Sequence, residues 1–215
     1  MSKVYVFSGL GADKRVFDEI NFGTLDVEFV DWIQPVGNES INEYAKRIAQ
    51  KIIAKEPILI GLSFGGIMAV EISKIVEVKK LILLASAKNQ SELPKIYRVL
   101  GKLKLHKFMP SSVFKKQNIV TNWLFGAKTK ENKILLKNIL EDTDSRFLKW
   151  AMDEIVNWQN TTMPHNCIHI HGNKDRIIPI RNCQVDYLID GGGHFMTINH
   201  AKEIETIIKE ECTID

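Results

Sequence analysis

A Gly-x-Ser-x-Gly pattern at residues 61–65 constrains the fold of this chain more than any other feature. The apolar residues before it predict a buried strand over 57–62, and the residues after it predict a helix over 65–76. A serine between a strand and a helix, with a glycine two residues away on either side, is typical of a sharp, strained turn that exposes the serine hydroxyl. The pattern therefore predicts a nucleophile at Ser63, and a serine that only caps the helix is the alternative.

An acid and a histidine lie in two loops nearer the carboxyl terminus. Asp175 comes shortly after the strand predicted at 167–170, and His194 comes shortly after the strand predicted at 185–189. The carboxyl ends of parallel strands meet at one edge of a sheet, which is where open α/β sheets place their active sites. Together with Ser63, these residues follow the order serine, acid, histidine in which some hydrolases carry a catalytic triad.

These motifs resemble those of the α/β-hydrolase superfamily. The turn around Ser63, the His171-Gly-x-x-Asp175 loop and the segment Gly192-Gly-His194-Phe match the superfamily's three motifs in order. The resemblance covers nearly the whole chain, except that the superfamily's first two strands are missing. It implies that Ser63 is the nucleophile, His194 the general base and Asp175 the acid that orients the histidine. It also implies a reaction that needs neither a metal nor an organic cofactor.

A second acid competes with Asp175 for the role of orienting His194. Asp190 ends the last predicted strand, four residues before the histidine. Such a short span would have to fold back on itself to reach the imidazole. We therefore favour Asp175, which arrives from the loop of the neighbouring strand.

The resemblance further implies an oxyanion hole beside Ser63. The strand predicted at 3–8 leads into Ser8-Gly9, where members of the superfamily usually have His-Gly. The missing histidine does not remove the donor, because the donor is a backbone N–H. We therefore expect the N–H groups of Leu10 and Phe64 to stabilise the oxyanion, each lowering the barrier by ~3 kcal/mol.

The amino-terminal loop also allows a competing interpretation. Gly9-x-Gly11-x-x-Lys14 lies between a predicted strand and a predicted helix, and Asp31 follows at the end of the next strand. This arrangement is part of a dinucleotide-binding pattern. Lys14, however, stands where that pattern needs a third glycine, and its long side chain would obstruct close packing of helix on strand. We therefore disfavour a dinucleotide site.

Four potential metal ligands alternate along one predicted strand: His165, Cys167, His169 and His171. A period of two places them on one face. At ~3.3 Å per residue, however, the outer two lie about 20 Å apart, so four ligands cannot converge on one tetrahedral ion. We expect their polar groups to be satisfied within the sheet, and we expect no metal site.

The order of the predicted elements indicates an α/β fold with an insertion. Strands and helices alternate up to residue 87, whereas residues 88–162 contain only helical patterns. We expect a six-stranded, mainly parallel sheet with flanking helices, formed by 1–87 and 163–215, and a helical cap at 88–162. The predicted strands lie at 3–8, 26–32, 57–62, 79–86, 167–170 and 185–189; the predicted helices lie near 13–20, 40–54, 65–76, 93–105, 112–124, 130–140 and 145–158, with a last one from about 201.

Charge and cysteine content limit the partners and the compartment. The net charge of the 215-residue chain is only +3, but residues 88–137 carry twelve lysines and arginines against two acids. These cations are spread over several predicted helices, which disfavours nucleic acid, and no apolar stretch approaches a membrane span. Three sparse cysteines indicate a reducing compartment, so we expect a cytoplasmic protein without stable membrane association. The oligomeric state stays open.

Taken together, these features predict a serine hydrolase that cleaves an ester or related acyl bond of a small molecule through an acyl-enzyme. A serine nucleophile disfavours haloalkane and epoxide hydrolysis, which need a carboxylate on this fold. Two alternatives remain. One is a lyase or C–C bond hydrolase that uses the same triad. The other is a receptor-like relative that binds a ligand and turns it over slowly or not at all.

Overall fold

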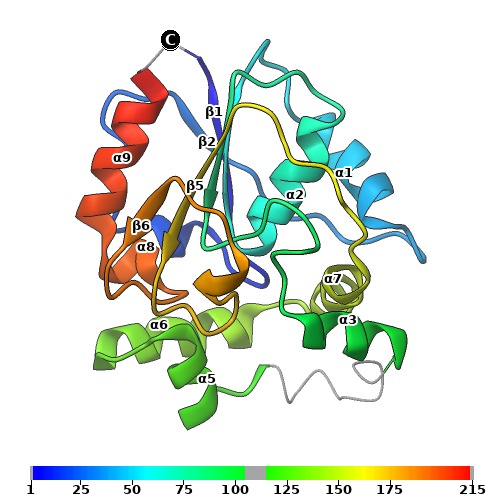
Figure 1. Cartoon of the computed structure of the whole chain (residues 1–215), viewed down its shortest axis with the longest axis vertical. Helices are drawn as coiled ribbons and strands as arrows, with labels where there is room; N and C mark the ends of the chain where they lie inside the picture. The colour runs from blue at the N-terminus through cyan, green and yellow to red at the C-terminus, as the bar shows by residue number, and fades with distance from the viewer. Residues whose placement is uncertain (1, 105–114, 214–215) are drawn as a thin grey trace.

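The computed structural model describes residues 2–104 and 115–213, which form a central parallel sheet with helices on both of its faces (Figure 1). The sheet has six strands in the order β2-β1-β3-β4-β5-β6, and every neighbouring pair is parallel. The strands are β1 (Val4–Phe7), β2 (Val27–Phe29), β3 (Ile58–Leu62), β4 (Lys80–Leu84), β5 (Cys167–Gly172) and β6 (Tyr187–Ile189). The predicted six-stranded α/β fold is therefore confirmed.

The central strands are apolar because helices cover both faces of the sheet. β1 and β3 are buried along their whole length. One face packs against α1 (Ile41–Ala49) and α2 (Phe64–Ser73), with Tyr44 and Met68 among the buried contacts. The other face packs against α9 (Ala201–Thr213), through residues such as Ile204. β2 and β6, which lie at the two edges, have only three residues each and are shorter than predicted.

The helices alternate with the strands up to β4, and most of the others lie beyond the carboxyl ends of the strands (Figure 1). No helix within the described parts of the chain has both the length and the apolar character that a membrane span requires. The α-helices are α1 (Ile41–Ala49), α2 (Phe64–Ser73), α3 (Lys95–Lys102), α5 (Ile119–Phe125), α6 (Lys130–Asp142), α7 (Ser145–Asn157), α8 (Met196–Asn199) and α9 (Ala201–Thr213), and single 3-10 turns occur at Lys14–Phe17 and Ile180–Asn182.

Helix boundaries differ from the predicted ones where capping decides them. Within the predicted helix at 112–124, α5 begins at Ile119, because the side chain of Asn118 accepts a hydrogen bond from the N–H of Thr121 and caps the helix there. Residues 116–118 are not helical, and residues 112–114 of that prediction lie outside the described residues. α3 begins after Pro94. The predicted helix at 13–20 is a single 3-10 turn.

Candidate active site

Ser63 lies on a strained turn between β3 and α2. Its φ of 53° and ψ of −119° fall in a region that side chains rarely adopt. Glycine is needed on both sides: a Cβ on Gly61 would lie 2.4 Å from the Cα of Gly66, and a Cβ on Gly65 would lie 2.3 Å from the carbonyl oxygen of Ser8. The pattern recognised in the sequence thus has a steric cause, since the strand, the turn and the helix meet at backbone contact distance.

The turn has further support that the sequence did not reveal. The hydroxyl of Ser86, just after β4, donates a hydrogen bond of 2.6 Å to the carbonyl oxygen of Ser63. The Ser63 N–H donates to the carbonyl oxygen of Leu84 at 2.9 Å. A Cβ on Gly66 would lie 2.3 Å from the Ser86 hydroxyl oxygen, so this second glycine is also required. Only the doubled glycine at 65–66 could have hinted at that close approach.

Ser63, His194 and Asp175 form one continuous line of hydrogen bonds. The Ser63 Oγ lies 2.8 Å from His194 Nε2, and His194 Nδ1 lies 2.7 Å from Asp175 Oδ2. A carboxylate only accepts, so Nδ1 carries the proton and Nε2 is free to accept from the serine hydroxyl. The histidine is therefore held in the tautomer that a general base needs.

The carboxylate of Asp175 is fully buried and is held by its own loop. Its Oδ1 accepts hydrogen bonds from the N–H groups of Ile177 and Ile178, at 2.8 and 2.9 Å. Burial by itself raises the pKa of this carboxyl, but His194, His171 and the Ile178 N–H together outweigh burial and hold the pKa below its usual value. Asp190, the alternative acid, is exposed and accepts instead from the side chain of Asn173, at 2.6 Å.

The loop expected to complete an oxyanion hole passes beside Ser63. A Cβ on Gly9 would lie 3.5 Å from the Cβ of Ser63. Ser8 donates from its hydroxyl to the carbonyl oxygen of Ala12 at 2.6 Å and so closes the loop. The Phe64 N–H is the first of α2 and has no acceptor within the helix.

Side chains from the segment predicted to be a cap reach this site. The ring of Phe125, at the end of α5, meets the imidazole of His194 edge-on with 5.7 Å between centroids. The rings of Phe147 and Trp150, from α7, each lie 6.1 Å from that of Phe64, next to Ser63. A cavity of about 230 Å³, whose lining includes Phe147, adjoins the loop after β1.

The dinucleotide interpretation finds no support in the geometry of this loop. The turn at Lys14–Phe17 has only four residues. The side chain of Asp13 accepts a hydrogen bond from the backbone N–H of Arg15 in this turn. A carboxylate at that position repels a phosphate. Lys14 itself is exposed rather than packed against the strand.

The alternating histidines of β5 do not form a metal site. Within the described residues, no group of three or more histidine, cysteine or acidic side chains could hold a metal ion. His169 and His171 instead contact each other, with 3.1 Å between Nε2 of the former and Nδ1 of the latter. The expectation that the polar groups of this strand are satisfied is wrong for His169, because its buried Nδ1 has no hydrogen-bond partner.

Comparisons with known proteins identify the fold. The sequence matches no family model and no curated protein. Among solved structures, the chain is similar to a bromoperoxidase from Bacillus anthracis, with a TM-score of 0.70, 14% identity and coverage of 100% of this chain and 93% of that one. It is also similar to an esterase from Thermogutta terrifontis (TM-score 0.68, 14% identity, 98% and 89% covered). A third similar structure is a meta-cleavage product hydrolase from Pseudomonas fluorescens (TM-score 0.66, 14% identity, 98% and 90% covered).

The likeness extends over nearly the whole length of each of these structures. The chain therefore has the fold of the α/β-hydrolase superfamily, as its three motifs suggest. At 14% identity the likeness shows the fold alone, and the reaction has to be argued from the site.

Proposed function

We propose that this protein is a serine hydrolase that cleaves an ester or related acyl bond. The observation that supports this function best is the line of hydrogen bonds from Ser63 through His194 to Asp175. Ser63 attacks the substrate carbonyl while His194 takes its proton, and Asp175 stabilises the imidazolium that forms. The imidazolium then protonates the leaving group, and water, activated by the same histidine, releases the acyl group from the serine.

Two backbone N–H groups stabilise the oxyanion of each tetrahedral intermediate. The Phe64 N–H begins α2, where the helix dipole adds to the hydrogen bond. The Leu10 N–H follows Gly9, the residue of the loop that approaches Ser63. Backbone donors held by the fold need no rearrangement during a reaction.

Residues 88–162 are proposed to act as a cap over a core made of 1–87 and 163–215. The proposal is supported by the contacts of Phe125 with His194 and of Phe147 with Phe64. Side chains at these places would contact the acyl group of a small substrate and set its preferred length.

The cytoplasm is the proposed compartment. All three cysteines of the chain, Cys167, Cys183 and Cys212, are free thiols. A thiol that stays unpaired suits a reducing environment.

A C–C bond hydrolase is the second candidate for the reaction. The meta-cleavage product hydrolase among the similar structures shares this fold, and a serine–histidine pair also suits hydrolysis next to a ketone. The two candidates differ in the bond that is broken, so a panel of acyl esters separates them from each other.

Labelling with a fluorophosphonate probe tests the proposed function directly. We expect the wild-type protein to be labelled at Ser63 and S63A to remain unlabelled. A series of p-nitrophenyl esters of increasing chain length then measures turnover and acyl preference. Labelling without turnover of any ester would support the C–C hydrolase or the receptor-like alternative, and absence of labelling would refute a working nucleophile.

A further inference from the structure

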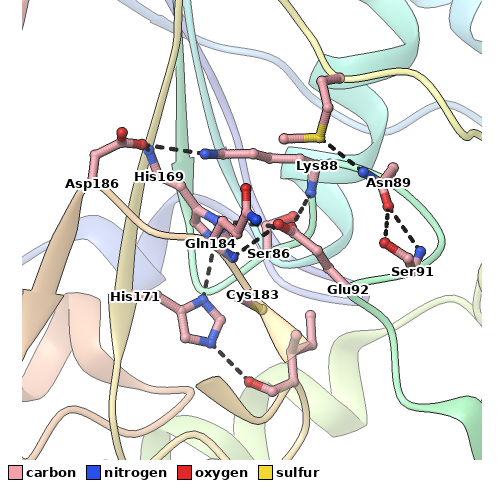
Figure 2. Close-up of polar contacts among 12 residues, drawn as sticks. Ser86, Lys88, Asn89, Ser91, Glu92, His169, His171, Cys183, Gln184 and Asp186 are labelled. Carbon is pink, nitrogen blue, oxygen red and sulfur yellow. Dashed lines mark hydrogen bonds and ion pairs between the residues drawn. The ribbon is translucent and has the colours of Figure 1, made fainter. Parts of the chain in front are cut away.

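Two buried histidines of β5, His169 and His171, contact each other (Figure 2), and His171 also lies next to Asp175 of the proposed triad. His171 Nε2 lies 2.8 Å from the carbonyl oxygen of Ile178 and 3.6 Å from Asp175 Oδ2, the same oxygen that accepts from His194. His171 therefore contacts both ends of the turn at 175–178 that presents the acid. Neither histidine side chain reaches solvent, so their contacts are made wholly within the protein.

The contacts fix the tautomers of both histidines. A carbonyl oxygen only accepts, so Nε2 of His171 carries a proton. Burial lowers the pKa of His171 and lowers that of His169 to about 3, so both rings are neutral at pH 7. The Nδ1 of His171 is then a lone pair, and the Nε2 of His169, at 3.1 Å, has to be the donor to it. His169 thus locks His171 in the form that can hold the turn.

His169 is in turn anchored to the loops on the other side (Figure 2). Its backbone N–H donates to Asp186 Oδ2 at 2.7 Å, and this carboxylate pairs with Lys88 Nζ at 3.3 Å. The buried Glu92 accepts from the N–H groups of Lys88 and Gln184, at 2.6 and 3.1 Å, which ties the start of the proposed cap to the segment before β6.

The buried pair of His169 and His171 is unfavourable for the stability of β5, a strand inside the sheet. The Nδ1 of His169 is buried and makes no hydrogen bond of good geometry, and the groups that face His169, Glu92 Oε2 at 3.9 Å and the backbone of Ser86 and Gln184, are acceptors. An unpaired buried acceptor destabilises a protein, and apolar side chains at 169 and 171 would avoid that cost. Features that lower stability in this way tend to be kept where they serve function.

We propose that His171 is a positioning residue for Asp175, tethering the turn at 175–178 through Ile178 and kept in its donor tautomer by His169. This inference rests on the proposed triad. With the tether in place, Asp175 Oδ2 stays on His194 Nδ1 and the imidazolium is stabilised whenever it forms. Without it, the turn loosens and Asp175 spends less time on the imidazole.

Two substitutions of His171 distinguish the effect of its hydrogen bond to Ile178 from the effect of its side-chain volume. In H171Q the side-chain amide nitrogen can stand near the position of Nε2 and donate to Ile178, whereas in H171N the amide is too short to reach. His165, exposed at the start of the same segment, provides the matched control H165N. The rate of fluorophosphonate labelling is measured against pH for each variant, together with the far-downfield proton resonance of the His194 Nδ1–H.

We expect H171N to be labelled about tenfold more slowly, as when the partner that orients a reactive group is removed. The acid limb of its pH profile should move to lower pH, because an imidazolium that is less well paired loses its proton more easily, and its downfield resonance should weaken. H171Q and H165N should keep rates close to that of the wild type.

Two results would overturn the positioning role. One is wild-type labelling by H171N. The other is slower labelling with an unmoved or raised acid limb and an intact resonance, which indicates only a smaller folded fraction. If H171N does not fold, H169L is tested in its place. H169L removes the donor to His171 Nδ1 and leaves His171 itself, so the acid limb of its pH profile should also move to lower pH and its labelling should be severalfold slower. Unchanged behaviour of H169L would refute the proposal. If the wild type is not labelled, the proposed function fails, and the resonance still reports on the tether.

Discussion

At the scale of single residues, Ser63 has a backbone conformation that the chain maintains at a cost. Its positive φ is held by the close contacts of Gly61 and Gly65 and by the hydroxyl of Ser86. Strain of this kind, of order 1–3 kcal/mol, persists where the surrounding structure determines it. The serine hydroxyl is thereby placed against His194 before any substrate arrives.

Removing any member of the proposed triad should abolish most of the activity without unfolding the protein. We expect S63A, H194A and D175N each to lower kcat for an ester substrate by several orders of magnitude. Combining them should cost little more than one alone, because the three side chains act as a unit. Steady-state kinetics on the single and double variants measure this, with D190N as a control that should keep wild-type kcat. Wild-type turnover by S63A would contradict the mechanism.

At the scale of elements, the loops after β5 and β6 have to touch for the acid to meet the histidine. A Cβ on Gly172 would lie 2.2 Å from the carbonyl oxygen of Gly192. We expect G172A to push these loops apart, to lower the free energy of unfolding by about 1–3 kcal/mol and to lower kcat. G193A is the matched control, since its Cβ would meet nothing closer than 3.7 Å. Denaturant unfolding and ester kinetics measure both effects, and equal behaviour of the two variants would refute the steric argument.

Tyr97 of α3 links the proposed cap to the turn that holds Asp175. Its hydroxyl donates to the carbonyl oxygen of Ile177 at 2.9 Å, and burial raises its pKa to about 12, so it remains a donor at neutral pH. We expect Y97F to lose about 1 kcal/mol of stability and to turn over esters severalfold more slowly. Y187F, which loses a hydroxyl contact with Glu211 on α9, should lose stability alone. Equal turnover by both variants would contradict the link.

Some of these elements could be predicted from the sequence and others could not. The six strands follow from apolar runs, and the position of Ser63 follows from glycines that the backbone requires locally. The start of the helix at Ile119–Phe125 differs from the prediction because Asn118 caps it through a side-chain contact that composition does not reveal. Ser86 and Tyr97 were missed for a further reason: each acts across a long stretch of sequence, on a backbone carbonyl that carries no signature.

At the scale of the whole molecule, the buried histidines should make stability depend on pH. His169 has a pKa of about 3 in the folded protein against an ordinary value of 6.5, so between these values the unfolded chain binds the extra proton. Stability should therefore fall as the pH drops from 6.5 towards 3, by about 1.4 kcal/mol per pH unit from this group. The lowered pKa of His171 acts in the same direction below pH 6.5, and the lowered pKa of Asp175 does so only below its ordinary value of 3.8.

Replacing His169 with leucine should remove its share of that slope. Denaturant unfolding of the wild type and H169L at several pH values between 4 and 7 measures the difference, and H165L is the control that should keep the wild-type slope. Only the slope matters here, since H169L also leaves the Nδ1 of His171 without a donor. Parallel curves for the wild type and H169L would show that His169 is not held neutral by burial.

The hydrogen bond between Ser63 and His194 joins residues that are 131 positions apart in the chain. Contacts of such long range form late, because the chain between them has to be ordered before they gain anything. The helices and the first strands can form while the serine is still an ordinary alcohol. If Ser63 is the nucleophile we propose, its reactivity should therefore appear only when the carboxyl-terminal quarter has docked, and a newly made chain should not attack acyl groups around it before its folding is complete.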